Sequence, residues 1–356
     1  MKKPRLKLSG EKIFDIEKRI ILAFLMLFIG SLIARQVGNL HPAETAAPLK
    51  KKIQYMTALG KIREGDNWKP QGLGSQEDLA TLPKISAGLV IDFDLGQVLW
   101  SRNFKQKIAP ASLAKLATAM TALDIAAPSK LITISQTAAD QIPTKLALKV
   151  SEKITLDEAI AAIVLTSAND AAEALSGFLG DEIGNGTPTF MGLVNKKLGM
   201  IGASDSHFVT STGLDAEDQY STVYDLLIIA HEAKTNYPII SKMAALEYQK
   251  LPADSNHRLI DLPNWNALLG TYPGVDGLKI GYSEAAGYAT IVTAKRDSKY
   301  LMAIVIGAKS LEEREIAAAT LLNFGFSKFN IQPFPVSELN LVKRYQDWQR
   351  QLSLAN

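Results

Sequence analysis

The sequence predicts an α+β fold in which strands near the two ends of the folded region form one antiparallel sheet and a helical lobe is inserted between them. Two apolar runs, 87–92 and 97–101, flank a glycine-containing turn and predict a β-hairpin. Two further strand-like runs, 287–293 and 300–306, are separated by a polar turn. The long stretch 111–250 between these pairs has apolar residues at helical spacing.

The composition is typical of a folded chain with one large or two ordinary domains. The 356 residues are 47% hydrophobic and 21% charged, which excludes wholesale disorder. Residues 1–19 carry seven basic and three acidic side chains, so most of the positive charge lies in this segment. The net charge of the whole chain is +3, and the rest of the chain is therefore slightly acidic. A folded region with this charge lacks a basic surface for binding phosphates, so we expect no nucleic-acid partner. The absence of cysteine excludes disulfides, thiol catalysis and thiolate zinc sites.

Residues 20–34 form an uncharged apolar segment that follows the predicted cytoplasmic tail 1–19. As a helix the segment would reach about 22 Å, and its basic flanks can snorkel to make up the missing length. The positive charge before it places the residues after Arg35 outside the cytoplasm. We predict an uncleaved membrane anchor, because Leu32 stands where an export signal needs a small residue before Ala34. A cleaved export signal is the alternative.

The chain after this segment divides into a linker, a domain and a tail. Residues 35–84 mix lysine, glycine and proline without a sustained period, which is typical of a linker. The strand and helix signals define a domain over 85–330. In the tail, 331–356, apolar residues at i, i+4, i+7 and i+11 predict an amphipathic helix over 339–354: Leu341, Tyr345, Trp348 and Leu352. This helix lies either on a membrane or on its own domain.

Most common catalytic schemes lack their motifs in this chain. His231 and Glu232 begin like a zinc helix, but Thr235 stands where the second histidine is required, which disfavours a metalloprotease. The sequence has no Gly-x-Ser-x-Gly elbow, no phosphate loop and no strand-linked Gly-x-Gly-x-x-Gly. These absences disfavour α/β-hydrolases, P-loop enzymes and dinucleotide binders. The remaining chemistry is that of serine with lysine.

Ser112 and Lys115 form the first candidate pair, at the start of a predicted helix just after Pro110. Residues three apart on a helix share one face, so the lysine amine can reach the serine hydroxyl. A lysine that burial and a second cation keep neutral can act as the general base for a serine nucleophile. The motif alone is weak, because Ser9 and Lys12 repeat it by chance.

Two more polar pairs occupy positions where substrate could bind. Ser167 and Asn169 follow an apolar helical pattern, where a hydroxyl can relay a proton and a carboxamide can hold a substrate amide. Lys279 and Gly281 lie in a predicted strand, where the lysine offers a cation for a carboxylate and the glycine permits close approach of a substrate backbone. Each pair also occurs elsewhere in the chain by chance. The evidence for a functional site therefore lies in the order of the motifs and in the predicted elements on which they lie.

In this order the three motifs resemble the active-site blocks of the D-alanyl-D-alanine carboxypeptidases, the low-molecular-mass penicillin-binding proteins. The blocks are 110–116, 167–172 and 276–288, and the likeness covers about 83–330. The resemblance implies a β-lactamase/transpeptidase-like fold without cofactor or metal. It also implies peptidoglycan stem peptides as substrates and β-lactams as inhibitors. The predicted anchor 20–34 places the chain at the plasma membrane, with the catalytic domain outside the cytoplasm.

The resemblance further implies a role for each matched residue. Ser112 would be the nucleophile and Lys115 its base, with Ser167 relaying a proton to the leaving amine. Asn169 would clamp the peptide. The backbone N–H groups of Ser112 and Tyr282 would form the oxyanion hole.

Lys279 would hold the terminal carboxylate and help to keep Lys115 neutral, but the residue after it departs from the family pattern. Threonine or serine usually follows this lysine, whereas this chain has Ile280 and so loses a hydroxyl for the carboxylate. Ser283 is the candidate to supply the missing contact.

Three functions therefore stay open at this point: a D,D-carboxypeptidase, a D,D-endopeptidase that cuts cross-links, or a catalytically impaired peptidoglycan-binding homologue. A β-lactamase is disfavoured, because the Glu338-Leu339-Asn340 sequence lies too far past Lys279 to supply a deacylating glutamate.

Overall fold

The computed structural model describes residues 42–66 and 68–355, and residues 54–356 form one compact unit. The predicted tail 1–19 and the predicted membrane segment 20–34 lie outside the described residues. No helix within the described part of the chain has both the length and the apolar character needed to cross a membrane.

The range predicted to be a linker contains regular structure. Helix α2 spans Pro42–Leu59, and Ala58 near its end is buried in a small apolar cluster. Further along, isolated parallel bridges join Gln71 to Gln97 and Ser75 to Trp100. Contacts with the sheet therefore begin before residue 85, where the sequence pattern placed the start of the domain.

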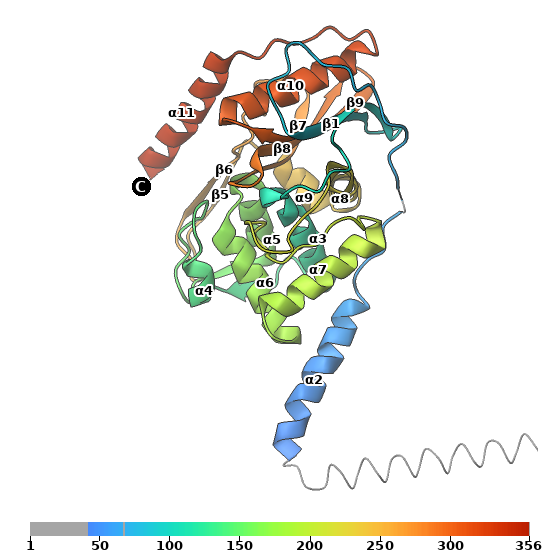
Figure 1. Cartoon of the computed structure of the whole chain (residues 1–356). Helices are drawn as coiled ribbons and strands as arrows, with labels where there is room; N and C mark the ends of the chain where they lie inside the picture. The colour runs from blue at the N-terminus through green and yellow to red at the C-terminus, as the bar shows by residue number, and fades with distance from the viewer. Residues whose placement is uncertain (1–41, 67, 356) are drawn as a thin grey trace, which may run out of the picture. The chain divides into compact units, whose positions relative to one another are not determined.

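One five-stranded sheet contains strands from both ends of the folded region (Figure 1). Its order is β2-β1-β9-β8-β7, and all neighbours are antiparallel. The strands are β1 (Ala87–Asp92), β2 (Gln97–Arg102), β7 (Val275–Ser283), β8 (Gly287–Arg296) and β9 (Lys299–Ala308). Because β1 pairs with β9, the predicted sheet from both ends, with its β1–β2 hairpin, is confirmed.

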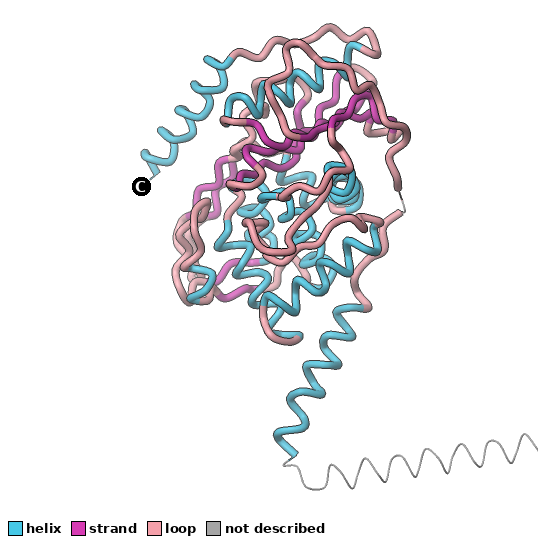
Figure 2. The backbone as a smooth tube through the Cα atoms, viewed as in Figure 1, coloured by secondary structure: helices cyan, strands magenta, loops and turns pink. Residues whose placement is uncertain are grey.

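The helical lobe between β2 and β7 packs on one face of the sheet (Figures 1 and 2). The core between lobe and sheet contains apolar side chains of both, including Leu113, Leu116 and Ile304. The helices of the lobe are η1 (Ala111–Ala114), α3 (Lys115–Ile125), α4 (Gln136–Ala139), α5 (Leu156–Ala161), η2 (Ala162–Thr166), α6 (Asn169–Ile183), α7 (Thr187–Ile201), α8 (Val223–Asn236) and α9 (Pro238–Ala244). The lobe also contains two small two-stranded sheets. One pairs β3 (Leu131–Thr133) with β4 (Lys153–Thr155), and the other pairs β5 (Tyr248–Leu251) with β6 (Ile260–Pro263).

Two C-terminal helices cover the other face of the sheet. Helix α10 (Leu311–Ser327) packs on β8 and β9, and α11 (Glu338–Ala355) packs beside α10. The predicted amphipathic helix is therefore present. Its Leu341, Tyr345 and Trp348 are buried in an apolar cluster that also contains side chains of the sheet and of α10. Of the two placements left open by the sequence, the helix takes the one on its own domain.

Candidate active site

The Ser112 hydroxyl and the Lys115 amine meet at the start of the helical lobe. Ser112 lies in η1, which begins at Ala111 with φ of +48°, a conformation that alanine rarely adopts. Helix α3 then begins at Lys115. Lys115 Nζ lies 2.7 Å from Ser112 Oγ, so the contact expected from the spacing is present.

The surroundings of Lys115 suit a general base. Its Nζ also donates to Asn169 Oδ1 at 2.8 Å and to the Thr212 carbonyl at 2.6 Å. The side chain is fully buried, and this burial lowers the pKa of Lys115 to about 7, although Asp170 acts in the opposite direction. A substantial fraction of Lys115 is therefore neutral near pH 7 and able to accept a proton.

Ser167 and Asn169 follow the π-helical turn η2, a feature that is frequent at functional sites. Ser167 ends this turn in the left-handed conformation, with φ of 61° and ψ of 30°. The Asn169 carboxamide is held at both ends, because its oxygen accepts from Lys115 and its nitrogen donates to the Ile142 carbonyl at 3.0 Å. These contacts fix the orientation of the carboxamide beside the serine.

Strand β7 approaches η1 closely at Gly281. A Cβ added to Gly281 would lie 3.1 Å from the Ser112 backbone nitrogen and 3.2 Å from Ala111 Cβ. Glycine is therefore needed for this approach. The approach brings β7 next to the Ser112 backbone, as an oxyanion hole shared by the N–H groups of Ser112 and Tyr282 requires.

A cavity of about 360 Å³, here called the catalytic cavity, gives access to the serine. Five of the predicted site residues line it: Ser112, Ser167, Asn169, Gly281 and Tyr282. Lys115 and Lys279, which are almost completely buried, are not among the residues that line it. The structure thus brings the three sequence motifs together around one opening.

Lys279 lies among other cations with its ammonium group turned to the backbone. Its Nζ donates to the Ile280 carbonyl at 2.8 Å. Burial lowers the pKa of Lys279 well below its usual value, and the charges of Lys115 and Arg314 lower it further. The role of Lys279 as the group that holds the terminal carboxylate stays a prediction.

The structure separates Ser283 from the catalytic cavity. The Ser283 hydroxyl donates to Asp215 Oδ1 at 2.7 Å and accepts from the Ala286 N–H at 3.2 Å. Ser283 follows Ile280 by three positions, so the two side chains leave opposite faces of β7. The expectation that Ser283 replaces the hydroxyl missing at Ile280 stays a prediction.

Arg314 is a functional candidate that the sequence analysis missed. It lines the catalytic cavity together with Ile280, although its side chain is almost fully buried. Its Nη2 donates to Glu315 Oε1 at 2.5 Å and to the Tyr345 hydroxyl at 3.0 Å. The surrounding Leu-Glu-Glu-Arg-Glu sequence predicts an exposed helix face, so no local signal marks this arginine.

Thr212 and Asp170 were also missed, although both lie inside or beside quoted motifs. The Thr212 carbonyl accepts a hydrogen bond from Lys115. Asp170 follows Asn169 directly, and its buried carboxylate accepts from the backbone N–H groups of Leu146 and Leu148. Both residues position other groups of the site.

Comparison with protein families gives one match across most of the folded region. The family model described as D-alanyl-D-alanine carboxypeptidase matches residues 76–310. The D-alanyl-D-alanine carboxypeptidase DacF of Bacillus subtilis (strain 168) is 31% identical over 255 residues, which cover 70% of this chain and 64% of that relative. The chain thus spans somewhat less than two thirds of the length of this relative.

Two solved structures share the fold. A D-alanyl-D-alanine carboxypeptidase from Mycobacterium tuberculosis H37Rv is 28% identical, with a TM-score of 0.63 over 73% of this chain and 96% of that one. Penicillin-binding protein D2 from Listeria monocytogenes, in its ampicillin-bound form, is 26% identical, with a TM-score of 0.60 over 70% of this chain and 100% of that one. The predicted fold class is confirmed by these structures.

Proposed function

Because this chain belongs to the D-alanyl-D-alanine carboxypeptidase family, we propose that it removes the terminal D-alanine from peptidoglycan stem peptides through an acyl-enzyme on Ser112. The observation that carries the proposal is the buried lysine beside the serine. Lys115 Nζ lies 2.7 Å from Ser112 Oγ, and its pKa is lowered to about 7. The serine in turn lines a cavity that a peptide end can enter.

In the proposed reaction, neutral Lys115 takes the hydroxyl proton as Ser112 Oγ attacks the carbonyl carbon of the penultimate D-alanine. Backbone N–H groups of Ser112 and Tyr282 stabilise the negative oxygen. The C–N bond then breaks, and Ser167 relays a proton to the leaving nitrogen. Water, activated by the same lysine, hydrolyses the ester and releases the shortened peptide.

The terminal carboxylate of the substrate needs a cationic partner. We assign this role to Arg314, which lines the catalytic cavity beside Ile280 and is also paired with the buried Glu315 carboxylate. This assignment supports turnover without a hydroxyl at position 280.

The test is incubation with benzylpenicillin, followed by intact-mass analysis and peptide mapping, beside an assay of D-alanine release from a pentapeptide. We expect one adduct, on Ser112, and release of D-alanine, with both lost in Ser112→Ala. An adduct on another residue, or none at millimolar penicillin, would contradict the proposed nucleophile. An adduct without D-alanine release would favour the impaired peptidoglycan-binding homologue.

We also propose that residues 20–34 anchor the chain in the plasma membrane with the catalytic domain outside the cytoplasm. The charge pattern of the sequence supports this orientation. Membrane fractionation, with protease added to intact cells and to lysed cells, tests it. Recovery of full-length chain in the soluble fraction would contradict the anchor.

A further inference from the structure

The guanidinium group of Arg314 is held at the wall of the catalytic cavity through one of its nitrogens. Arg314 lies in α10 and is 1% exposed. Its Nη2 donates to Glu315 Oε1 at 2.5 Å, to the Tyr345 hydroxyl at 3.0 Å and to the Trp265 carbonyl at 3.2 Å. The orientation of the guanidinium therefore depends on the three acceptors around Nη2.

The Tyr345 hydroxyl closes a hydrogen-bonded triangle with the ion pair of Arg314 and Glu315. It accepts from Arg314 and donates to Glu315 Oε1 at 3.0 Å. All three side chains are buried. Burial, together with the charge of Glu315, raises the pKa of Tyr345 well above its usual value. The hydroxyl therefore keeps its proton at physiological pH and donates it to Glu315 throughout that range.

Tyr345 reaches the catalytic cavity because helix α11 docks on the domain. Leu341 and Trp348 of this helix are buried in the apolar cluster that α11 shares with the sheet and α10. Tyr345 lines the catalytic cavity together with Arg314 and Ile280. The match to the family model ends at residue 310, so the contact between Tyr345 and Arg314 lies in a part of the chain that this match does not cover.

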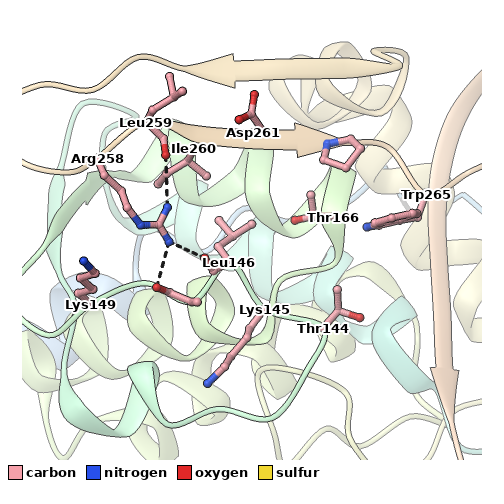
Figure 3. A pocket seen from close by; sticks show the side chains of 12 residues that line it. Thr144, Lys145, Leu146, Lys149, Thr166, Arg258, Leu259, Ile260, Asp261 and Trp265 are labelled. Atoms are coloured by element: carbon pink, nitrogen blue, oxygen red, sulfur yellow. Dashed lines mark hydrogen bonds between the residues drawn. The ribbon is translucent and has the colours of Figure 1, made fainter. Parts of the chain in front are cut away.

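Arg258 is a second arginine near the catalytic cavity, but backbone carbonyls occupy its guanidinium group. It lies in the wall of a larger cavity, of about 730 Å³, which shares Trp265 with the catalytic cavity (Figure 3). Its nitrogens donate at 2.7, 3.0 and 3.3 Å to the carbonyls of Leu146, Ala147 and Leu259. Arg314, by contrast, lines the catalytic cavity itself.

The Glu315 carboxylate competes with a substrate carboxylate for the Arg314 guanidinium. Glu315 Oε2 is buried and has no hydrogen-bond partner among the described residues, so Oε1 receives all the hydrogen bonds that offset the charge. One of them comes from Tyr345. Without that hydroxyl, Glu315 would depend more strongly on Arg314 and would draw the guanidinium toward itself. Ile280 offers no hydroxyl that could compensate for this loss.

We propose that Tyr345 is a positioning residue, which holds the Arg314 guanidinium in place for the terminal carboxylate of the substrate. Through this residue, helix α11 makes the chain selective for peptides that end in a free carboxylate. The inference rests on the proposed function, in which Arg314 binds that carboxylate. Because Tyr345 acts through Arg314, its effect is confined to substrates that carry the charge.

The test compares a depsipeptide that ends in D-alanyl-D-lactate with the methyl ester of the same depsipeptide. Both compounds form the same acyl-enzyme on Ser112, but the methyl ester lacks the charge that Arg314 binds. In the parent, kcat/KM should favour the free carboxylate by about ten- to a hundredfold, since hydrogen bonds to charged groups are of that strength. Tyr345→Phe, which removes only the hydroxyl, should reduce this preference by about two- to tenfold.

The loss should appear as a higher KM for the free carboxylate with little change in kcat, because Arg314 binds this group both before and during the reaction. Turnover of the methyl ester should stay within about twofold of the parent. Tyr345→Met is a second variant without the hydroxyl and should behave in the same way. Leu341→Val is the matched control on α11, because Leu341 is buried but does not line the catalytic cavity. It should lower the thermal stability and leave the preference unchanged.

Equal losses on the two compounds in the Tyr345 variants would show that Tyr345 only supports the fold, and would overturn the inference. An unchanged preference in both variants would also overturn it, as would a parent that does not distinguish the two compounds. Penicillin acylation of the parent separates these results from a failure of the proposed function. An adduct on Ser112 would leave that function standing, whereas its absence would overturn the proposed function itself.

Discussion

The chemistry of this site at the residue scale depends on the protonation state of Lys115. Burial, together with hydrogen bonds to Asn169 and to the Thr212 carbonyl, places the amine beside the serine hydroxyl. With its pKa lowered to about 7, the amine is neutral in the upper part of the physiological pH range and protonated below it.

Lys115→Arg should abolish penicillin acylation of Ser112, because a guanidinium group keeps its proton at neutral pH and cannot act as a base. In the parent, the acylation rate should fall as the pH drops through about 7, since the protonated amine cannot accept the serine proton. Both effects are measured as the rate of adduct formation by intact mass. Acylation of the arginine variant at the parental rate would exclude Lys115 as the base.

Ile280→Thr should raise kcat/KM for a pentapeptide by about ten- to a hundred-and-fifty-fold, if the new hydroxyl adds a hydrogen bond to the charged carboxylate. Ile280 lines the catalytic cavity beside Arg314. Isoleucine and threonine are both β-branched, so β7 should accept the change. Steady-state assays on pentapeptide and cross-linked dimer measure the effect. No gain on either substrate in an active parent would indicate that Arg314 already binds the carboxylate fully.

Helix α11 contributes both to the packing of the fold and to the surroundings of the catalytic cavity. Its Tyr345 contacts Arg314 and Glu315, and its Trp348 packs edge-on against Trp265 with ring centroids 5.7 Å apart. Trp265 in turn lines the catalytic cavity. The helix therefore forms part of the wall of the catalytic cavity, since its Tyr345 and Gln349 line that cavity.

Trp348→Ala should lower the free energy of unfolding by about 3–5 kcal/mol, because it removes a buried indole and leaves a cavity. Leu339→Ala on the same helix is the control and should change it by less than about 0.5 kcal/mol, since Leu339 is 77% exposed. Chemical denaturation followed by tryptophan fluorescence and circular dichroism measures both. Equal effects of the two substitutions would show that α11 does not dock as described.

At the scale of the whole molecule, all residues of the candidate site and of the three apolar clusters lie in the compact unit that begins at Gln54. A chain that begins at Gln54 should therefore fold and be acylated by penicillin within about twofold of the parental rate. Thermal unfolding and the acylation rate test this expectation. Loss of either would mean that residues 1–53 contribute to the catalytic unit.

The sequence by itself determined the features that depend on short-range geometry. The β1–β2 hairpin follows from two apolar runs across a turn, and α11 follows from its apolar spacing. The contact between Ser112 and Lys115 follows because a separation of three residues in a helical turn fixes which side chains meet. These features could be predicted because the backbone imposes them locally.

Only the tertiary structure decided the features that join distant segments. Arg314 is buried at the site because α10, α11 and β7 converge there, although its neighbours in sequence are those of an exposed helix. Ser283 donates to Asp215 across 68 residues, and Arg258 donates to carbonyls more than a hundred residues earlier in the chain. Such contacts depend on how elements pack, and packing has no fixed period or spacing along the chain.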